Sequence, residues 1–140
     1  MTNESPWELL LGNAGVLQAA LTDAEPALAD AGLTDVKAFF LLTSVEQHPG
    51  PADLARALML PRPTVTFLVK RAEAAGHLKR LPVPGDLRRF QLKLTPRGRR
   101  AMNAGRDAVD QAFASYLGRL SSAEAATFRK LIRKLAGAGE

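Results

Sequence analysis

The stretch ADLARALMLPRPTVTFLVKRAEAAGHLKRLPVPGDLRRFQLKLTPRGRR, residues 52–100, decides the fold of this chain. Its apolar spacing predicts a short helix over residues 52–58. Met59-Leu60-Pro61 then turns the chain into a longer helix, from about Arg62 to Ala75. Strict alternation of polar and apolar residues from Arg89 to Leu94 predicts the half-buried strand of a hairpin. Two helices joined by a tight turn and followed by a basic hairpin are typical of a winged helix-turn-helix.

The longer helix separates apolar from basic side chains around its axis. At about 100° per residue, one side gathers Val65, Leu68, Val69 and Ala72, and the other gathers Pro63, Phe67, Lys70, Arg71 and Ala74. The first side is the expected core face. The second side is basic, carries one large ring and is expected to face outward.

Positive charge is concentrated in the same stretch. The chain has 140 residues and a net charge of +5, which is enough for one domain with its own core. Residues 51–100 hold twelve basic and three acidic side chains, net +9, whereas residues 1–50 hold one and seven, net −6, and residues 101–140 hold six and four, net +2. A local basic segment is expected at a binding site for a polyanion, usually nucleic acid or an anionic membrane surface. The simpler alternative is a solvated, arginine-rich face.

The composition argues against several classes of function. There is no cysteine, which excludes disulfides, thiolate metal sites and a cysteine nucleophile, and two lone histidines argue against a histidine-built metal site. We find no paired carboxylates, activated nucleophile or glycine-rich phosphate loop, so we predict no enzyme activity, no cofactor and no metal. The N-terminal MTNESPWELLLGN has neither a basic n-region nor a long apolar run, so we expect a cytoplasmic protein without a membrane span.

Two helices are predicted before this stretch. Apolar residues recur at helical spacing from about Pro6 to Ala31, and Pro26 is expected to kink or break this helix. Thr34 is the expected N-cap of the next helix, which ends before His48. The expected apolar face of that second helix is Val36, Phe39, Phe40, Thr43 and Val45.

Two further helices are predicted after the hairpin. Thr95-Pro96 supplies an N-cap and a proline at the first helical position for a long helix reaching about Leu117. Ser121-Ser122-Ala123-Glu124 is a capping-box sequence and predicts the start of a last helix. Both helices are amphipathic, so their apolar stripes are available to pair with another chain.

In order and spacing, these motifs resemble the MarR family of transcriptional regulators. The family's short "eLA" helix is matched by Asp53-Leu54-Ala55, and its recognition-helix pattern by Arg62-Pro63-Thr64-Val65-Thr66 with Gly76. The "D.R" wing tip is matched by Asp86 with Arg88, and the "LT..G" junction by Leu94-Thr95 with Gly98. The resemblance runs along nearly the whole chain, and the ordered series is far more specific than any single motif.

The resemblance implies a single MarR-type domain over residues 1–140 that is mainly α-helical with a small β-hairpin wing. A winged helix-turn-helix core, about residues 33–95, is then flanked by dimerisation helices, about residues 1–31 and 96–138. The implied function is that of a homodimeric repressor that binds a pseudo-palindromic operator in double-stranded DNA. A small ligand often releases such regulators from their operator.

The recognition helix is expected to enter the major groove with short polar side chains and arginine near the base edges. The residues expected to contact DNA from this helix are Arg62, Pro63, Thr64, Thr66, Phe67, Lys70 and Arg71. Family members more often carry a polar or basic residue at the position of Phe67. Its ring has two open interpretations, which are contact with thymine methyl groups and packing beside the hairpin.

In the wing, the resemblance implies that Arg88 reaches the minor groove while Asp86 holds either the loop or the guanidinium. Leu87 stands where the family commonly has an arginine, and Arg89 is the candidate substitute for that phosphate contact. An ordinary ion pair within the turn is the alternative interpretation. On the first strand of the hairpin, Lys79 and Arg80 are expected to make supporting phosphate contacts.

An effector pocket is implied by the resemblance alone, since the family keeps it between the dimer helices and the winged domain. The candidate lining residues are Phe39, Phe40, Met102, Arg106 and Phe113, with Arg106 as the partner of an anionic, aromatic ligand. Core or dimer contacts are the alternative interpretation of the apolar residues. His77, directly after Gly76, is expected to pack in the core.

Two other classes of function fit the same basic face. A non-sequence-specific architectural protein would use it without reading bases, and would bind operator and random duplex equally well. A winged-helix module for protein interactions would show salt-insensitive binding and no DNA footprint.

Overall fold

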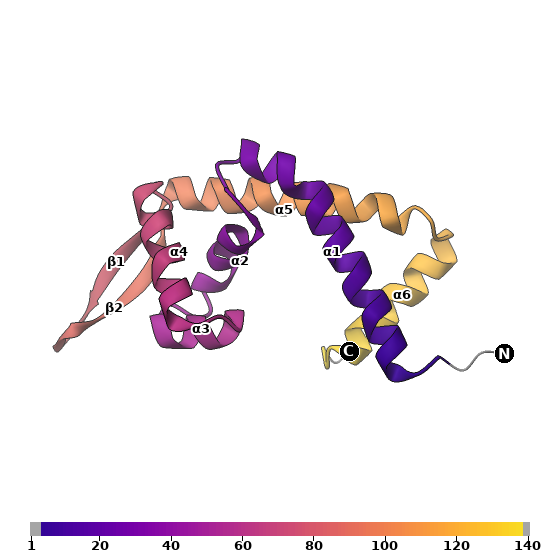
Figure 1. Cartoon of the computed structure of the whole chain (residues 1–140), viewed down its shortest axis with the longest axis horizontal. Helices are drawn as coiled ribbons and strands as arrows, with labels where there is room; N and C mark the ends of the chain where they lie inside the picture. The colour runs from indigo at the N-terminus through magenta and orange to yellow at the C-terminus, as the bar shows by residue number, and fades with distance from the viewer. Residues whose placement is uncertain (1–3, 139–140) are drawn as a thin grey trace. The chain divides into compact units, whose positions relative to one another are not determined.

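The computed structural model describes residues 4–138; residues 1–3 and 139–140 of the predicted domain lie outside the described part. In the described residues, six helices and one antiparallel hairpin follow one another in the order α1, α2, α3, α4, β1, β2, α5 and α6 (Figure 1). The predicted fold class, mainly α-helical with a small hairpin wing, is confirmed.

The helices are α1 (Pro6–Asp30), α2 (Val36–Val45), α3 (Pro51–Leu58), α4 (Arg62–Ala74), α5 (Pro96–Leu117) and α6 (Ser122–Leu135), and the strands are β1 (Leu78–Val83) and β2 (Asp86–Leu94). They form two compact units. Residues 24–108 make up the winged-helix unit, and, among the described residues, 4–23 with 109–138 make up the terminal-helix unit. Helices α1 and α5 each contribute to both units.

The core of the winged-helix unit lies where α2, α3 and α4 pack on one another and on the hairpin (Figure 1). Its fully buried side chains are Leu28, Leu33, Leu41, Leu42, Val45, Leu54 and Val65. The predicted inner face of α4 is buried as expected, since Val65, Leu68, Val69 and Ala72 are all buried. Burial of this face leaves the opposite side of α4 free to face outward.

The first two helices differ from the prediction in two places. Helix α1 runs through Pro26 without a break, so of the kink or break expected there, the break is ruled out. Proline removes one intrahelical hydrogen bond, here to the carbonyl of Thr22, and the exposed position of Thr22 lets water replace it. Helix α2 is capped by Asp35 and not by Thr34, because the carboxylate Oδ1 of Asp35 accepts the N–H of Ala38 at 2.8 Å.

The buried face of α2 also differs from the predicted stripe. It consists of Phe39, Leu41, Leu42 and Val45, whereas Phe40 is 38% exposed. Helix α2 packs against α3, α4 and β2, so it is buried over more of its circumference than a single stripe. The buried side chains of α2 therefore point toward more than one neighbouring element.

The hairpin pairs β1 with β2 in register from Leu78 opposite Leu94 to Pro82 opposite Phe90, with an irregularity between Pro82 and Val83. Its turn contains Gly85 at φ +83°, a conformation that favours glycine. Leu92 and Leu94 are buried, as the alternation predicts, and Phe90 is half-buried. The N–H of Leu92 donates to the carbonyl of Pro49 at 2.8 Å, which ties the hairpin to the loop before α3.

The start of α5 is packed tightly against the chain that follows α4. The hydroxyl of Thr95 caps α5 by accepting the N–H of Gly98 at 2.9 Å, and it donates to the carbonyl of Gly76. A β-carbon on Gly98 would lie 2.8 Å from the carbonyl carbon of His77 and closer still to its oxygen. The "LT..G" spacing therefore has a steric reason in this chain.

His77 is buried at this junction, as expected from the sequence, with 5% of its surface exposed. Burial lowers the pKa of its imidazole below the ordinary value of 6.5, and the nearby cation of Arg97 lowers it further. The buried side chain is therefore favoured in its neutral form.

In the terminal-helix unit, α6 begins with the predicted capping box. The hydroxyl of Ser121 accepts the N–H of Glu124 at 3.1 Å, and the Glu124 carboxylate accepts the N–H of Ser121 at 2.9 Å. These hydrogen bonds lower the pKa of Glu124. The hydroxyl of Tyr116 in α5 donates to the carboxylate of Asp23 in α1, which raises the pKa of the phenol.

Candidate nucleic-acid interface

The outer face of α4 presents the residues that the sequence places on a recognition helix. Proline at the start of α4 favours helix initiation after the extended Pro61. In the preceding turn, Met59 adopts φ +55° and its N–H closes the end of α3. Arg62, Pro63, Thr66, Phe67 and Lys70 are exposed, and Thr64 and Arg71 are half-buried. All seven predicted residues are thus at least partly accessible.

Phe67 and Arg71 lie together on this outer face. The guanidinium carbon of Arg71 is 5.4 Å from the centre of the Phe67 ring. One nitrogen of Arg71 is 3.6 Å from Oδ2 of Asp35, the residue whose other carboxylate oxygen caps α2. Asp35 was not singled out from the sequence as part of this surface, because nothing in the pattern links the start of α2 to α4.

The wing presents Leu87, Arg88 and Arg89 on the outside of its tip, where Leu87 is fully exposed. Oδ1 of Asp86 accepts the backbone N–H of Arg88 at 3.0 Å. Of the two roles left open for Asp86, the structure shows the one in which its carboxylate holds the loop. The guanidinium of Arg88 extends from a turn whose backbone is fixed.

Arg80 on β1 lies between α4 and β2. Its Nε is 3.0 and 3.1 Å from the two carboxylate oxygens of Glu73, and its guanidinium carbon is 4.3 Å from the centre of the Phe90 ring. These contacts join the C-terminal end of α4 to both strands of the wing. Lys79, the other predicted phosphate contact of β1, is exposed. The sequence did not indicate Glu73 as part of this site. Its separation of seven residues from Arg80 is the one feature of the sequence that links the two side chains.

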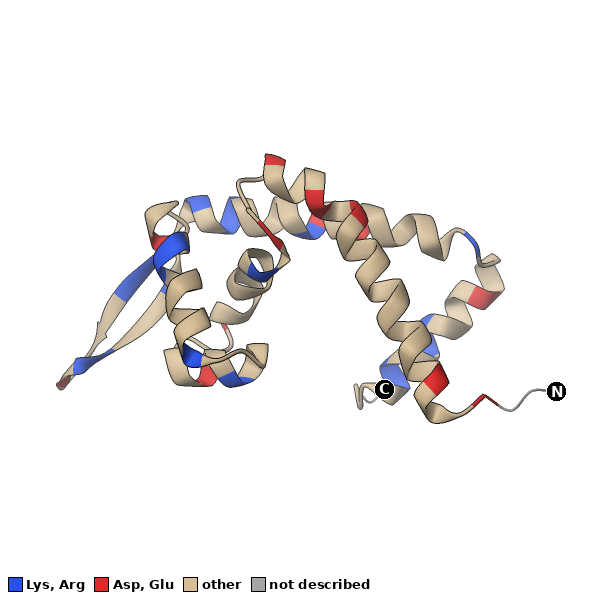
Figure 2. Cartoon of the chain, viewed as in Figure 1, with Lys and Arg blue, Asp and Glu red and all other residues tan. Residues whose placement is uncertain are grey.

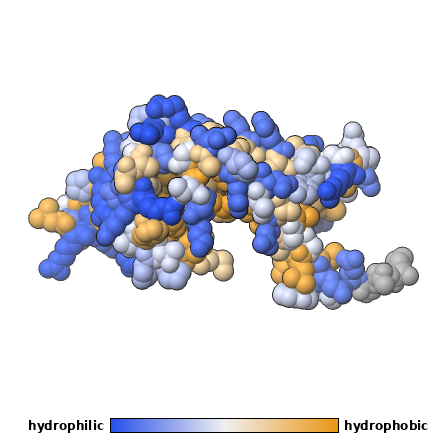
Figure 3. All heavy atoms as spheres, turned by 45° about the horizontal axis from the view of Figure 1, so that its top comes forward, coloured by the Kyte–Doolittle hydropathy of each residue, from blue (hydrophilic) through white to orange (hydrophobic). Residues whose placement is uncertain are grey.

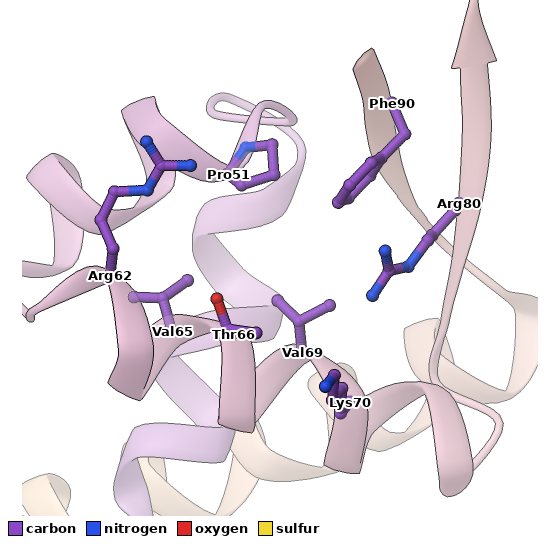
Figure 4. Close-up of a pocket in the computed structure, with 8 residues that line it drawn as sticks. All are labelled: Pro51, Arg62, Val65, Thr66, Val69, Lys70, Arg80 and Phe90. Atoms are coloured by element: carbon purple, nitrogen blue, oxygen red, sulfur yellow. The ribbon is translucent and has the colours of Figure 1, made fainter. Parts of the chain in front are cut away.

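Two clefts border the recognition helix and the wing. The first, about 240 Å³, has an apolar floor beneath a basic rim and is lined by Pro51, Arg62, Val65, Thr66, Val69, Lys70, Arg80 and Phe90 (Figure 4). The second, about 520 Å³, includes Arg56 from the last turn of α3, Arg62 from the start of α4, and Arg88 and Arg89 from β2. Pro51, Arg62 and Phe90 line both. Together they form a concave, cationic surface.

The distribution of charge agrees with this geometry. In the winged-helix unit, basic residues lie on the hairpin, on α4 and in the first turns of α5 (Figure 2). Most of these side chains are exposed rather than buried in ion pairs. Exposed cations on a concave surface attract and hold a polyanion.

The structure brings together only part of the predicted effector pocket. The rings of Phe39 and Phe40 are 5.7 Å apart, and Gly105 of α5 leaves the space that the Phe39 ring occupies. Met102 is buried, Arg106 is exposed, and Phe113 is half-buried in the terminal-helix unit. None of the five lines either cleft beside α4, so the pocket stays a prediction.

Within residues 4–138, no group of three or more histidine, aspartate or glutamate side chains is arranged to hold a metal ion. In the same part of the chain, no helix is both long and apolar enough to cross a membrane.

Comparison with proteins of known function places these features in one family. The chain is 31% identical to the HTH-type transcriptional regulator FarR of Neisseria gonorrhoeae over 105 residues, which cover 72% of each protein. It is 40% identical to the HTH-type transcriptional regulator PecS of Dickeya dadantii over 48 residues, which are 34% of this chain and 29% of PecS. No protein-family model matches the chain.

Solved structures agree with the sequence relatives. Apo MarR of E. coli has a TM-score of 0.80 at 23% identity, covering 96% of this chain and 98% of that one, and so shows the shared fold. The MarR family protein Rv2887 of Mycobacterium tuberculosis, in complex with DNA, has a TM-score of 0.73 at 26% identity, covering 94% and 98%. With its winged helix-turn-helix fold and these relatives, the chain belongs to the MarR family of transcriptional regulators.

Proposed function

We propose that this regulator is a homodimeric, cytoplasmic repressor that binds a pseudo-palindromic operator through α4 and the wing. The observation that carries the proposal is the outer face of α4, where the predicted DNA-contacting residues are accessible beside a basic wing. A helix of this kind fits the major groove, and an arginine at a hairpin tip fits the adjacent minor groove. The DNA complex of Rv2887 is further support.

The proposed contacts follow from the chemistry of each side chain. Arg62 suits guanine, whose O6 and N7 accept two hydrogen bonds, while Thr64 and Thr66 are short enough to approach base edges. Lys70 and Arg71 suit phosphates or base edges, and Pro63 lies against the groove wall. In the wing, Arg88 is assigned to the minor groove and Arg89 to a phosphate, with Lys79 and Arg80 as supporting contacts.

The proposal of a homodimer rests on the terminal-helix unit. Large apolar side chains are exposed along α1 and α6, and Figure 3 shows hydrophobic atoms on the surface beside the grey chain end. Among them are Trp7 at 64%, Leu10 at 59%, Leu17 at 56%, Leu131 at 51% and Leu135 at 81%. Apolar surface gathered in this way is typical of an interface between chains. A second copy that covers it would set two recognition helices at a fixed spacing.

Sedimentation velocity tests the dimer. Leu131→Asp places a charge on the apolar face of α6, and we expect it to give a monomer that no longer binds the operator. Ala126→Asp changes an exposed residue on the opposite side of the same helix and should leave the dimer intact. A wild-type chain that sediments as a monomer at micromolar concentration contradicts the proposal.

An aromatic, anionic effector is the second part of the proposed regulation. Rv2887 has been solved with salicylic acid and with p-aminosalicylic acid, at TM-scores of 0.75 and 0.76 to this chain. The candidate pocket is the predicted set around Phe39 and Arg106. We expect such acids to raise the thermal unfolding midpoint and to release the operator, and Arg106→Ala to weaken both effects. If an acid raises the unfolding midpoint but does not release the operator, the chain binds the ligand and the proposed regulation is contradicted.

The function itself is tested by selecting bound duplexes from a random pool and comparing them with unselected duplexes. Specific regulators typically bind their site about 10³-fold or more tightly than random DNA. The logarithm of the affinity should fall with the logarithm of salt concentration, by about 0.9 for each phosphate neutralised. Arg62→Ala should weaken binding, whereas Lys37→Ala, also exposed but on α2, should not. Equal affinity for all duplexes points to an architectural protein, and the absence of DNA binding contradicts both functions.

A further inference from the structure

We propose that Phe67 reads thymine in each half-site through the C5-methyl group, and that Asp35 and Arg71 hold the ring in position to do so. This inference rests on the proposed function, since it requires that α4 enters the major groove. It goes further by assigning one base feature to one side chain.

Phe67 occupies the part of α4 that is farthest from the core. Its position on the helix is opposite the buried side chains of Val65, Leu68, Val69 and Ala72. One turn before it lies the short Pro63, and one turn after it lie Lys70 and Arg71, of which Arg71 contacts the ring. The residue is 58% exposed, so its ring is accessible from outside the chain.

Packing beside the hairpin is the other interpretation of this ring, and the structure gives that place to Phe90. Phe90 points from β2 into the cleft between the hairpin and α4, together with Arg80 (Figure 4). From α4, the cleft is lined by Arg62, Val65, Thr66, Val69 and Lys70, and Phe67 is not among them. The ring of Phe67 is thus left for a partner outside the chain.

Arg71 and Asp35 hold the ring from one side. Arg71 lies 5.4 Å from its centre, and Asp35 lies 3.6 Å from a guanidinium nitrogen of Arg71. Asp35 is itself fixed, because its Oδ1 accepts the N–H of Ala38 at 2.8 Å. A ring restrained in this way loses less freedom on binding than a free one. Asp35 and Arg71 are therefore positioning residues for Phe67.

Thymine is the base that such a ring selects. In the major groove, an A·T pair presents the C5-methyl of thymine, which is the apolar feature that side chains such as phenylalanine contact. Cytosine presents an N4 amine and guanine presents O6 and N7, and an apolar ring leaves these groups without the hydrogen bonds they make in water. Phe67 thus favours thymine by attraction and disfavours G·C pairs by desolvation.

The test uses a duplex selected from a random pool and replaces each thymine in turn by deoxyuridine, which removes only the methyl group. At one symmetry-related position in each half-site we expect a loss of about fourfold per methyl, the value for burial of one methyl-sized group. Phe67→Ala should bind the thymine and uracil duplexes equally. Leu87→Ala, another exposed apolar residue of the same surface, should keep the difference.

Asp35→Asn keeps the oxygen that caps α2 and removes the charge that holds Arg71. We expect it to reduce the thymine-to-uracil ratio while the thermal unfolding midpoint stays near that of the wild type. If the wild type tolerates uracil at every position, or if Phe67→Ala keeps the ratio, the inference is overturned while selective DNA binding still stands. If no duplex is preferred over random DNA, both the inference and the proposed function fail.

Discussion

The guanidinium of Arg80 pairs with the carboxylate of Glu73, with Nη2 at 2.9 Å and Nε at 3.0 Å from Oε1. Glu73 belongs to the last turns of α4 and Arg80 to β1, so the pair connects the recognition helix to the wing. Phe90 of β2 lies under the same guanidinium. Three side chains from three elements thus help to fix the wing against α4.

We expect the free energies of unfolding of Glu73→Gln, Arg80→Gln and the double variant to show a coupling of about 0.2–1 kcal/mol, the range for exposed ion pairs. Amide exchange in β1 and β2 should become faster in both single variants, because the hairpin loses one of its links to α4. Asp53 and Arg56 form a more exposed pair within α3 and should show a coupling near zero. Equal coupling in the two pairs would count against a special role for Arg80.

Gly98→Ala is expected to destabilise the chain by about 1–3 kcal/mol or more, because the added methyl meets the backbone of His77, which cannot rotate away. The measurement is the unfolding free energy in urea. Arg100→Ala, an exposed change two residues later in α5, should stay within about 0.5 kcal/mol of the wild type. A Gly98→Ala chain as stable as Arg100→Ala would show that the junction can relax.

Buried His77 should make the chain less stable in mild acid. Its pKa is lower in the folded state than the ordinary value of 6.5, so the unfolded chain takes up a proton before the folded chain does. Neutral His77 therefore contributes its full share of the free energy of unfolding above about pH 6.5. This contribution is lost as the pH falls toward the pKa that His77 has in the folded chain. Unfolding free energies at several pH values check this.

The matched variants are His77→Gln and His48→Gln. The first should flatten the fall in stability below about pH 6.5, even if the variant is less stable at every pH. The second changes the other histidine of the chain and should keep the fall. A wild-type slope that persists in His77→Gln would assign the acid sensitivity to other groups.

Arg88→Ala is expected to lower operator affinity by about 1–3 kcal/mol without changing the thermal unfolding midpoint. Asp86→Ala should also weaken binding, since the turn that presents Arg88 loses the acceptor of its backbone N–H. Asp86→Asn keeps an oxygen at this place and should bind more tightly than Asp86→Ala. Fluorescence anisotropy on one selected duplex compares the three. Unchanged affinity in Arg88→Ala would reduce the wing to a structural element.

The order of the elements was predictable because local signals decide it. The alternation from Arg89 to Leu94 and the capping sequences at Thr95 and Ser121 act over a few residues, and the structure agrees with each. Pro26 does not break α1, because water can take the hydrogen bond that the exposed carbonyl of Thr22 loses. The cap of α2 was missed by one residue, since Thr34 and Asp35 are both good caps.

The outer face of α4 was predictable for the same reason, because four apolar residues define its inner face. The contacts that organise this surface were not. Glu73 with Arg80, and Asp35 with Arg71, join different elements, and their pairing depends on tertiary packing that no local pattern records. The effector residues Phe39 and Phe113 fall in different units, so their pocket remains an implication of family resemblance.

The most direct test of the central claim is a footprint of the full chain on a selected duplex, combined with its stoichiometry. We predict two protected half-sites about one helical turn, ~10 base pairs, apart, bound by two copies of the chain. Protection should disappear in Arg62→Ala at a concentration that saturates the wild type. Uniform protection without a dyad, or one chain bound to a single site, would contradict a dimeric operator-binding regulator.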